Sequence, residues 1–146
     1  GLVSQPKKFF IARGGGAVAT GTGEVESTGW RYSRSDSLPA LFDLVLYPFR
    51  GRTAPKVEVR PLVSTPEVTA LAVSAGPATD YVIISRAGRK EVQAGDITVD
   101  GEAAVLRTRD GVPLRLSGAN LKRVVYRGKT VFESETPEDQ LDRVLR

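Results

Sequence analysis

Three aspartates are the first residues of this chain whose type and spacing suggest chemistry. Asp80, Asp96 and Asp100 lie within a short stretch of sequence, and paired carboxylates act as acid and base or bind Ca²⁺. Each of them falls at an expected strand end or turn, where the Asp side chain favours local hydrogen bonds. We therefore interpret all three as turn residues rather than as a catalytic or calcium site.

Tyrosines are the remaining candidates for acid–base chemistry. Tyr47, Tyr81 and Tyr126 are possible general bases, but each lies inside an apolar segment typical of a core strand. The chain has no His and no Cys, so an imidazole base, a thiolate nucleophile, a disulfide and a His/Cys metal site are all excluded. The sequence therefore predicts no catalytic residue, no metal ligand and no cofactor.

Aromatic residues near the N-terminus suggest contact with a sugar. The segment from Glu24 to Ser33 alternates as a strand does, which places Trp30 and Tyr32 on one face and Arg31 on the other. Aromatic rings beside Arg stack on a sugar ring and hold its carboxylate. The alternative is that Trp30, the only tryptophan, anchors the core.

The stretch from Thr79 to Ser134 predicts the architecture that positions these residues. Its short apolar segments are separated by Asp100-Gly101, Asp110-Gly111 and Arg127-Gly128, and Asp-Gly between short strands is a strong hairpin signal. We expect an all-β fold, an antiparallel β-sandwich of two packed sheets built from meander hairpins. Asp100-Gly101 is expected to form a two-residue loop.

The second Asp-Gly pair predicts where two arginines lie. A three-residue loop, Arg109 to Gly111, pairs Leu106 with Leu114 and Ala104 with Leu116, and keeps one face apolar. This register places Arg107 and Arg115 together on the outer face. Such a pair is either neutralised by nearby acids or holds an anion, and we treat both arginines as candidate carbohydrate-binding residues.

The ends of the chain complete the expected single domain, residues 1–146. Residues 1–23 predict a loose strand and a Gly-rich loop or irregular edge strand, and Leu41 to Arg50 predicts a strand buried on both faces. Further strands are expected over Val57 to Val63 and Val68 to Val73. Residues 136–146 predict a short C-terminal helix, because an N-cap Thr is followed by Pro and two acids.

Composition is that of an ordinary soluble globular protein. The 146 residues are 40% hydrophobic and 26% charged, and the net charge is +4. This mild positive charge permits an acidic partner such as a uronic-acid polymer, or it serves solubility alone. We expect neither a nucleic-acid partner nor a membrane span. Met is absent even at the start, which indicates a processed product or an excised part of a longer chain.

Five short segments carry a resemblance to a known family. They are Leu44 to Pro48, Thr79 to Val82, Asp100 to Arg107, Gly118 to Leu121 and Arg127 to Ser134. Together they resemble the C-terminal β domain of heparinase II/III-type polysaccharide lyases. The resemblance implies a secreted or periplasmic setting, an acidic polysaccharide as substrate of the parent enzyme, and a helical toroid domain as partner.

This sequence departs from the family where catalysis is concerned. The family's β region commonly contributes a His to the cleft and to a metal site, whereas this chain has none. The resemblance therefore predicts a non-catalytic accessory β-sandwich domain, and transfers no catalytic residue. Two alternatives stay open: a structural subunit of an extracellular filament or surface assembly that self-associates through the N-terminal strand, and an independent enzyme.

Overall fold

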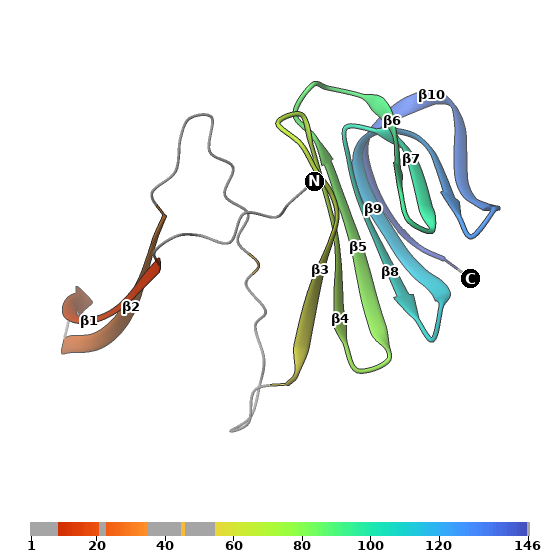
Figure 1. Cartoon of the computed structure of the whole chain (residues 1–146). Helices are drawn as coiled ribbons and strands as arrows, with labels where there is room; N and C mark the ends of the chain where they lie inside the picture. The colour runs from red at the N-terminus through yellow and green to blue at the C-terminus, as the bar shows by residue number, and fades with distance from the viewer. Residues whose placement is uncertain (1–8, 21–22, 35–44, 46–54, 146) are drawn as a thin grey trace. The chain divides into compact units, whose positions relative to one another are not determined.

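The computed structural model describes residues 9–20, 23–34, 45 and 55–145. The chain divides into two compact units, Gly1–Phe42 and Asp43–Arg146 (Figure 1). In the described residues all regular secondary structure is β-strand and all strand pairs are antiparallel, which confirms the all-β prediction. No helix in this part of the chain is long and apolar enough to cross a membrane.

The first unit contains a two-stranded sheet. Strand β1 (Phe9–Thr20) pairs with β2 (Gly23–Arg34) without a register shift, from Phe9 opposite Arg34 to Thr20 opposite Gly23. Of the two alternatives for the Gly-rich run, the strand is therefore the one that forms, because residues 14–20 continue β1. Strand pairing uses backbone groups alone, so glycines extend a strand wherever a partner strand supplies the ladder.

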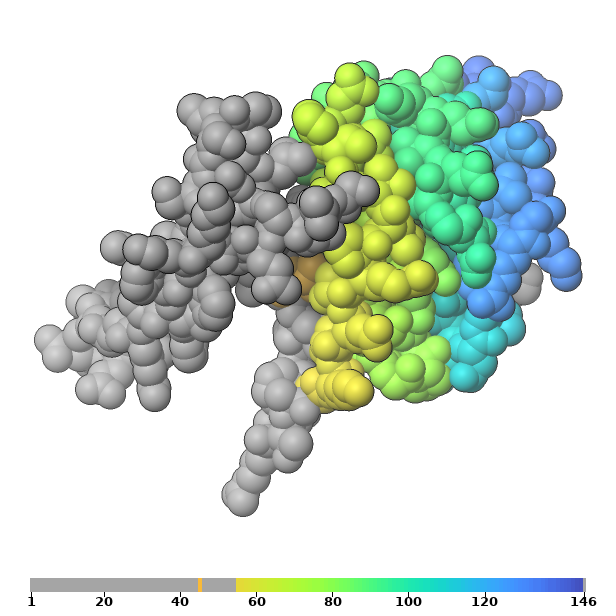
Figure 2. Space-filling model, in the orientation of Figure 1, coloured from red at the N-terminus to blue at the C-terminus, as the bar shows by residue number. Residues whose placement is uncertain are grey.

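The second unit is one connected sheet of eight strands. They are β3 (Val57–Ser64), β4 (Val68–Ala75), β5 (Ala78–Ser85), β6 (Lys90–Ala94), β7 (Ile97–Gly101), β8 (Ala103–Arg109), β9 (Val112–Tyr126) and β10 (Lys129–Val144). Hydrogen bonding connects them in the order β3-β4-β5-β8-β9-β7-β6, and β10 pairs with β9. The sheet curls until it nearly closes on itself (Figure 1), and its strands form one continuous packed surface, from yellow β3 to blue β10, in the space-filling view (Figure 2).

The long strand β9 explains why two separate packed sheets do not form. Its first half pairs with β8, its second half pairs with β7, and β10 pairs with both halves. Strand β9 therefore joins the strands that pair with its first half to those that pair with its second half, and all of them form a single curled sheet. The expected two-sheet sandwich is replaced by this continuous arrangement.

The Asp100-Gly101 pair does not form the expected hairpin. Strands β7 and β8 instead follow each other along the same edge of β9, with Asp100 opposite Arg123 and Ala103 opposite Ala119. Gly101 is buried and its φ lies outside the left-handed region, so it does not supply the geometry of a tight turn. Burial of this glycine in the core overrides the local turn signal.

Gly101 is used for close packing at the bend of β9. Between the β8 and β7 registers β9 carries one extra residue, and Asn120 there adopts a left-handed φ of 48°. The fully buried side chain of Leu121 then packs over Gly101 and Gly118: a Cβ built on Gly101 would lie 2.6 Å from Leu121 Cδ1. The bend therefore requires two residues without side chains beneath one leucine.

The hydrophobic core lies on the inner face of the curled sheet. Its largest fully buried apolar side chains are Ile83, Ile97, Leu106, Leu116, Leu121, Val99 and Val124. Tyr81 and Tyr126 belong to the same cluster, which confirms that both are core residues. Strands over 57–63 and 68–73 are confirmed by β3 and β4, whereas the strand expected over 41–50 lies outside the described residues except for Val45.

The C-terminal helix expected over residues 136–146 does not form in the described part, which ends at residue 145. These residues extend β10, with Gln140 opposite Ala119 and Asp142 opposite Ser117. Pro137 falls in an irregular stretch between the Glu133 and Glu138 pairs, where the ladder needs no donor from it. A short helix is marginal by itself, while the free edge of β9 offers a complete ladder to this segment.

Replacing Gly118 by Ala tests the packing at the bend. The new Cβ would lie 2.7 Å from the backbone oxygen of Ala103 and 2.9 Å from Leu121 Cδ2. We expect Gly118→Ala to lower the free energy of unfolding by about 1–3 kcal/mol, measured by urea denaturation. Thr130→Ala, at an exposed position of β10, is the control and should change stability by less than about 0.5 kcal/mol. Equal stability of both variants would contradict this account of the bend.

Ser85 offers a second stability test. Its side chain is 3% exposed, and Oγ has no hydrogen-bond partner among the described residues. A buried hydroxyl without a partner costs free energy, so Ser85→Ala should stabilise the protein by about 1 kcal/mol, measured as a rise in melting temperature. A fall in melting temperature would show that the hydroxyl makes a stabilising hydrogen bond.

Candidate functional site

A tight turn and a bulge bring Arg107 and Arg115 together. The turn consists of Asp110 and Gly111 alone, with left-handed φ values of 51° and 77°, so the expected three-residue loop was wrong. Leu114 is an extra residue on β9 between the pairs Thr108–Pro113 and Arg107–Arg115. This bulge shifts the register so that Leu106 faces Leu116 and the two arginines lie directly opposite each other.

The outward position of both arginines is confirmed. Each side chain is 55% exposed, and the alternating pattern of β8 buries Leu106 and Thr108 on either side of Arg107. The sequence predicted the face correctly and the register wrongly. A two-residue turn plus a one-residue bulge gives the same face as a three-residue loop does.

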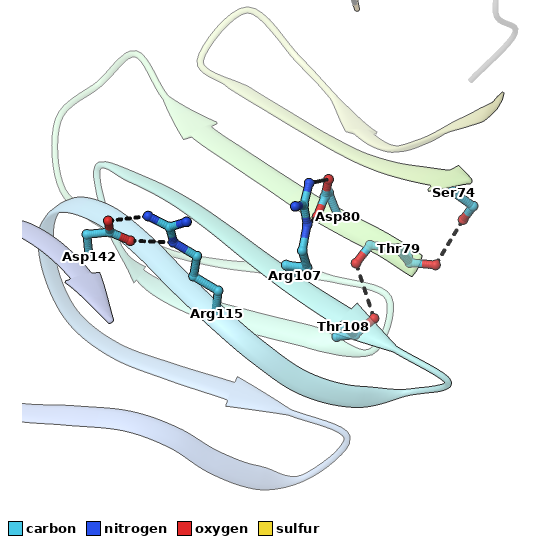
Figure 3. Close-up of polar contacts among 7 residues, drawn as sticks. All are labelled: Ser74, Thr79, Asp80, Arg107, Thr108, Arg115 and Asp142. Carbon is cyan, nitrogen blue, oxygen red and sulfur yellow. Dashed lines mark hydrogen bonds and ion pairs between the residues drawn. The ribbon is translucent and has the colours of Figure 1, made fainter. Parts of the chain in front are cut away.

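Arg107 forms a bidentate ion pair with Asp80 on the neighbouring strand β5. Its Nε donates to Asp80 Oδ1 and its Nη2 to Asp80 Oδ2, both at 2.7 Å (Figure 3). The two residues are directly opposite in the β5–β8 register. This fork-to-fork geometry is the strongest arrangement available to an Arg–carboxylate pair.

Arg115 forms the matching pair with Asp142 on β10. Its Nε donates to Asp142 Oδ1 at 2.8 Å and its Nη2 donates to Oδ2 (Figure 3). The Ser117 hydroxyl also donates to Asp142 Oδ1, at 2.8 Å. Hydrogen bonds from Arg115 and then Ser117 lower the pKa of Asp142 from 3.8 to about 2, and the bond to Asp142 raises the pKa of Arg115.

These four side chains form what we call the ion-pair row: Asp80, Arg107, Arg115 and Asp142, on β5, β8, β9 and β10. The charges run minus, plus, plus, minus across the outer face, so the row has no net charge. The central pair is two like charges directly opposite, an unfavourable arrangement that the outer carboxylates offset. The row offers the hydrogen-bond donors of two guanidinium groups to an anion.

A second set of polar contacts lies beside the row and holds β5 against its neighbours. The Thr108 hydroxyl donates to the backbone oxygen of Thr79 at 3.2 Å, and the Thr79 and Ser74 hydroxyls lie 3.0 Å apart (Figure 3). Sequence reasoning did not find these residues, because the contacts depend on which strands become neighbours.

The other candidate sugar-binding residues lie in the first unit. Both belong to β2, where Trp30 is opposite Arg13 and Tyr32 is opposite Ile11 in the backbone register. The strand expected over Glu24 to Ser33 is confirmed. The structure brings Arg107 and Arg115 together, and it does not join the two aromatic residues to them in one unit.

The three candidate aspartates do not form one site. Asp96 lies in the turn between β6 and β7, as expected, with Arg127 Nε 3.2 Å from its Oδ2. Asp100 lies at the end of β7, also as expected, with its Oδ1 3.5 Å from Arg89 Nε, whereas Asp80 lies inside β5. Among the described residues, no group of three or more potential metal-binding side chains comes together.

The two described tyrosines are packed against each other. The rings of Tyr81 and Tyr126 have centroids 5.4 Å apart at 58°, and the Arg127 guanidinium lies 5.2 Å from the Tyr126 ring centre. Burial, followed by the hydrogen bond with Tyr126, raises the pKa of Tyr81 to about 12. Tyr81 therefore stays protonated at neutral pH and is not a ready general base; Tyr47 lies outside the described residues.

Comparison with known proteins leaves the family open. No protein-family model matches the chain, and no curated protein matches it.

The carboxyl of Asp142 provides a direct test of the row. Because its pKa is lower in the folded chain than the ordinary 3.8, the pairing stabilises the fold above about pH 4 and is lost as the pH falls through about 2. We expect the Asp142 carboxyl carbon to titrate near pH 2 in a ¹³C NMR experiment, and Ser117→Ala to raise that midpoint. An ordinary midpoint in the wild-type protein would contradict the pairing with Arg115.

Proposed function

We propose that this chain is a non-catalytic accessory β domain of a heparinase II/III-like polysaccharide lyase, and that its ion-pair row contacts an acidic polysaccharide. In this proposal the protein acts in a secreted or periplasmic setting, beside a helical toroid domain of the parent protein. The observation that carries it is the exposed, directly opposed pair Arg107 and Arg115.

The chemistry of the pair suits carboxylates and sulfates. A guanidinium presents five donors in a planar fork that matches either anion, and Asp142 occupies two of those donors on Arg115. Both arginines project from strands rather than from loops, so their spacing is fixed by the ladder beneath them. Repeated acidic groups along a polymer provide the anions that such a fixed pair recognises.

The segments that resemble the lyase family support the accessory role through the fold. Gly118 to Leu121 forms the bend of β9, Gly101 lies beneath it, and Arg127-Gly128 forms the turn between β9 and β10. These are packing and turn positions, which fits a domain that supports a lyase rather than one that carries its catalytic groups. The lack of His and the protonated state of Tyr81 point the same way.

A structural subunit of an extracellular filament or surface assembly is the second candidate. The favouring observation is the β1–β2 sheet, in which two strands of 12 residues pair only with each other among the described residues. Each strand then has one backbone edge outside that sheet, and such edges add strands from another chain. Concentration-dependent assembly without glycan would favour this candidate over the accessory domain.

Binding to an immobilised sulfated or uronic-acid polymer tests the proposal. We expect wild-type protein to bind with an affinity that falls steeply with salt, because the contacts are charge-assisted. The double variant Arg107→Ser and Arg115→Ser should lose this binding and stay folded with only a modest fall in melting temperature, since both arginine side chains are 55% exposed.

A charge-matched control separates the site from general attraction. Arg123→Ser with Lys129→Ser also removes two positive charges, from the opposite end of the β9–β10 hairpin, and should retain binding to the polymer. Equal loss in both double variants would show that net charge alone drives binding. No binding by the wild-type protein, or binding indifferent to salt, would overturn the role proposed for the row.

A further inference from the structure

The two carboxylates of the ion-pair row are held to different degrees. The Asp80 side chain is 20% exposed, whereas that of Asp142 is 55% exposed. Asp80 lies on β5, which is paired with β4 on one side and with β8 on the other. Asp142 lies on β10, which pairs only with β9 in the described sheet. The backbone beneath Asp142 is therefore held along one edge only.

The end of β10 is exposed on its outer side, and its last contacts are the backbone hydrogen bond from Leu145 to Leu114 and the packing of Leu145 against the core. Val144, two residues after Asp142, is 70% exposed, and Arg143 is exposed between them. Strand edges near their ends open at lower free energy than central strands do. A rotamer change at Asp142 needs no change in the core, because the buried residue of this segment is Leu141.

Chemistry also favours exchange at Asp142. When its carboxylate leaves Arg115, the Ser117 hydroxyl, which donates to Oδ1 at 2.8 Å in the paired state, becomes a donor available to the incoming anion. The guanidinium of Arg115 then faces outward beside Arg107, where two like charges are directly opposite. An anion placed there would contact both positive charges and so reduce the repulsion between the arginines. The carboxylate of Asp142 contacts Arg115 alone.

We infer that Asp142 is an exchangeable counter-ion of Arg115. An acidic ligand binds Arg115 by displacing Asp142, while the Asp80–Arg107 ion pair stays intact. This inference rests on the proposed function, and it assigns different roles to the two arginines. Arg115 is the residue that contacts the ligand. Arg107, fixed by Asp80, is the positioning residue that adds positive potential beside it.

The strength of binding by two variants tests the exchange. The probes are a sulfated heparin oligosaccharide and an oligouronate without sulfate, which distinguish sulfate from carboxylate as the bound group. Asp142→Asn should bind roughly two- to fivefold more tightly than wild type by isothermal titration calorimetry, because a competing exposed ion pair is removed. Glu133→Gln is the matched control: it changes charge equally on the same strand, where Glu133 pairs with Arg123 at 3.6 Å.

A spectroscopic measurement on the wild-type protein keeps the test independent of any variant. Titration with the heparin oligosaccharide should shift the NMR signal of the Arg115 Nε–H group strongly and that of Arg107 weakly. Equal tightening by Asp142→Asn and Glu133→Gln, or a larger shift at Arg107, would overturn the exchange while leaving glycan binding intact. No binding by wild type or by Asp142→Asn would overturn both this inference and the proposed function.

Discussion

The bend in β9 is the constraint on which the second unit depends. One strand of 15 residues pairs with β8, β7 and β10, so any change in its course moves three neighbours at once. The bend exists because Leu121, fully buried, occupies space that only glycine leaves free at positions 101 and 118. Burying one leucine contributes about 2 kcal/mol, and here the same side chain also sets the curvature of the sheet.

A second irregularity of β9 determines the surface, as the bend determines the core. Without the bulge at Leu114, the tight Asp110-Gly111 turn would place Arg107 opposite Leu114 rather than opposite Arg115. The bulge thus aligns the arginines and still leaves Leu106 facing Leu116 in the core. Bulges commonly re-aim side chains in this way. The position of the ion-pair row is therefore a property of the strand's register and not of a loop.

Local signals in the sequence predicted the positions of the strands better than they predicted which strands pair with each other. Turn residues and alternation located most strands of the second unit and the outer face of Arg107, because both depend on nearby residues. The same kind of signal failed at Asp100-Gly101 and at Thr136-Pro137. In the first case burial beneath Leu121 overrides a hairpin, and in the second the open edge of β9 captures a segment with helical capping residues.

The acidic partners of the arginines were beyond local reasoning for a related cause. Asp80 and Asp142 lie 27 residues from Arg107 and Arg115, respectively, and meet them only because β5 and β10 flank the β8–β9 hairpin. The sequence did predict that two like charges side by side must be neutralised by acids or must hold an anion. It did not predict which strands supply the acids, because that depends on strand pairing.

The energetics of the row separate stability from recognition. Exposed ion pairs add little to the free energy of folding, and two arginines directly opposite each other reduce even that gain. A row of uncharged β-branched residues at these exposed strand positions would serve the sheet at least as well. Folding alone therefore does not explain these charges, and the anionic ligand that we propose would explain them. Of the two pairs, the one at the sheet edge has the more exposed carboxylate, and in the exchange that we infer this difference in exposure between Asp80 and Asp142 becomes a difference in function.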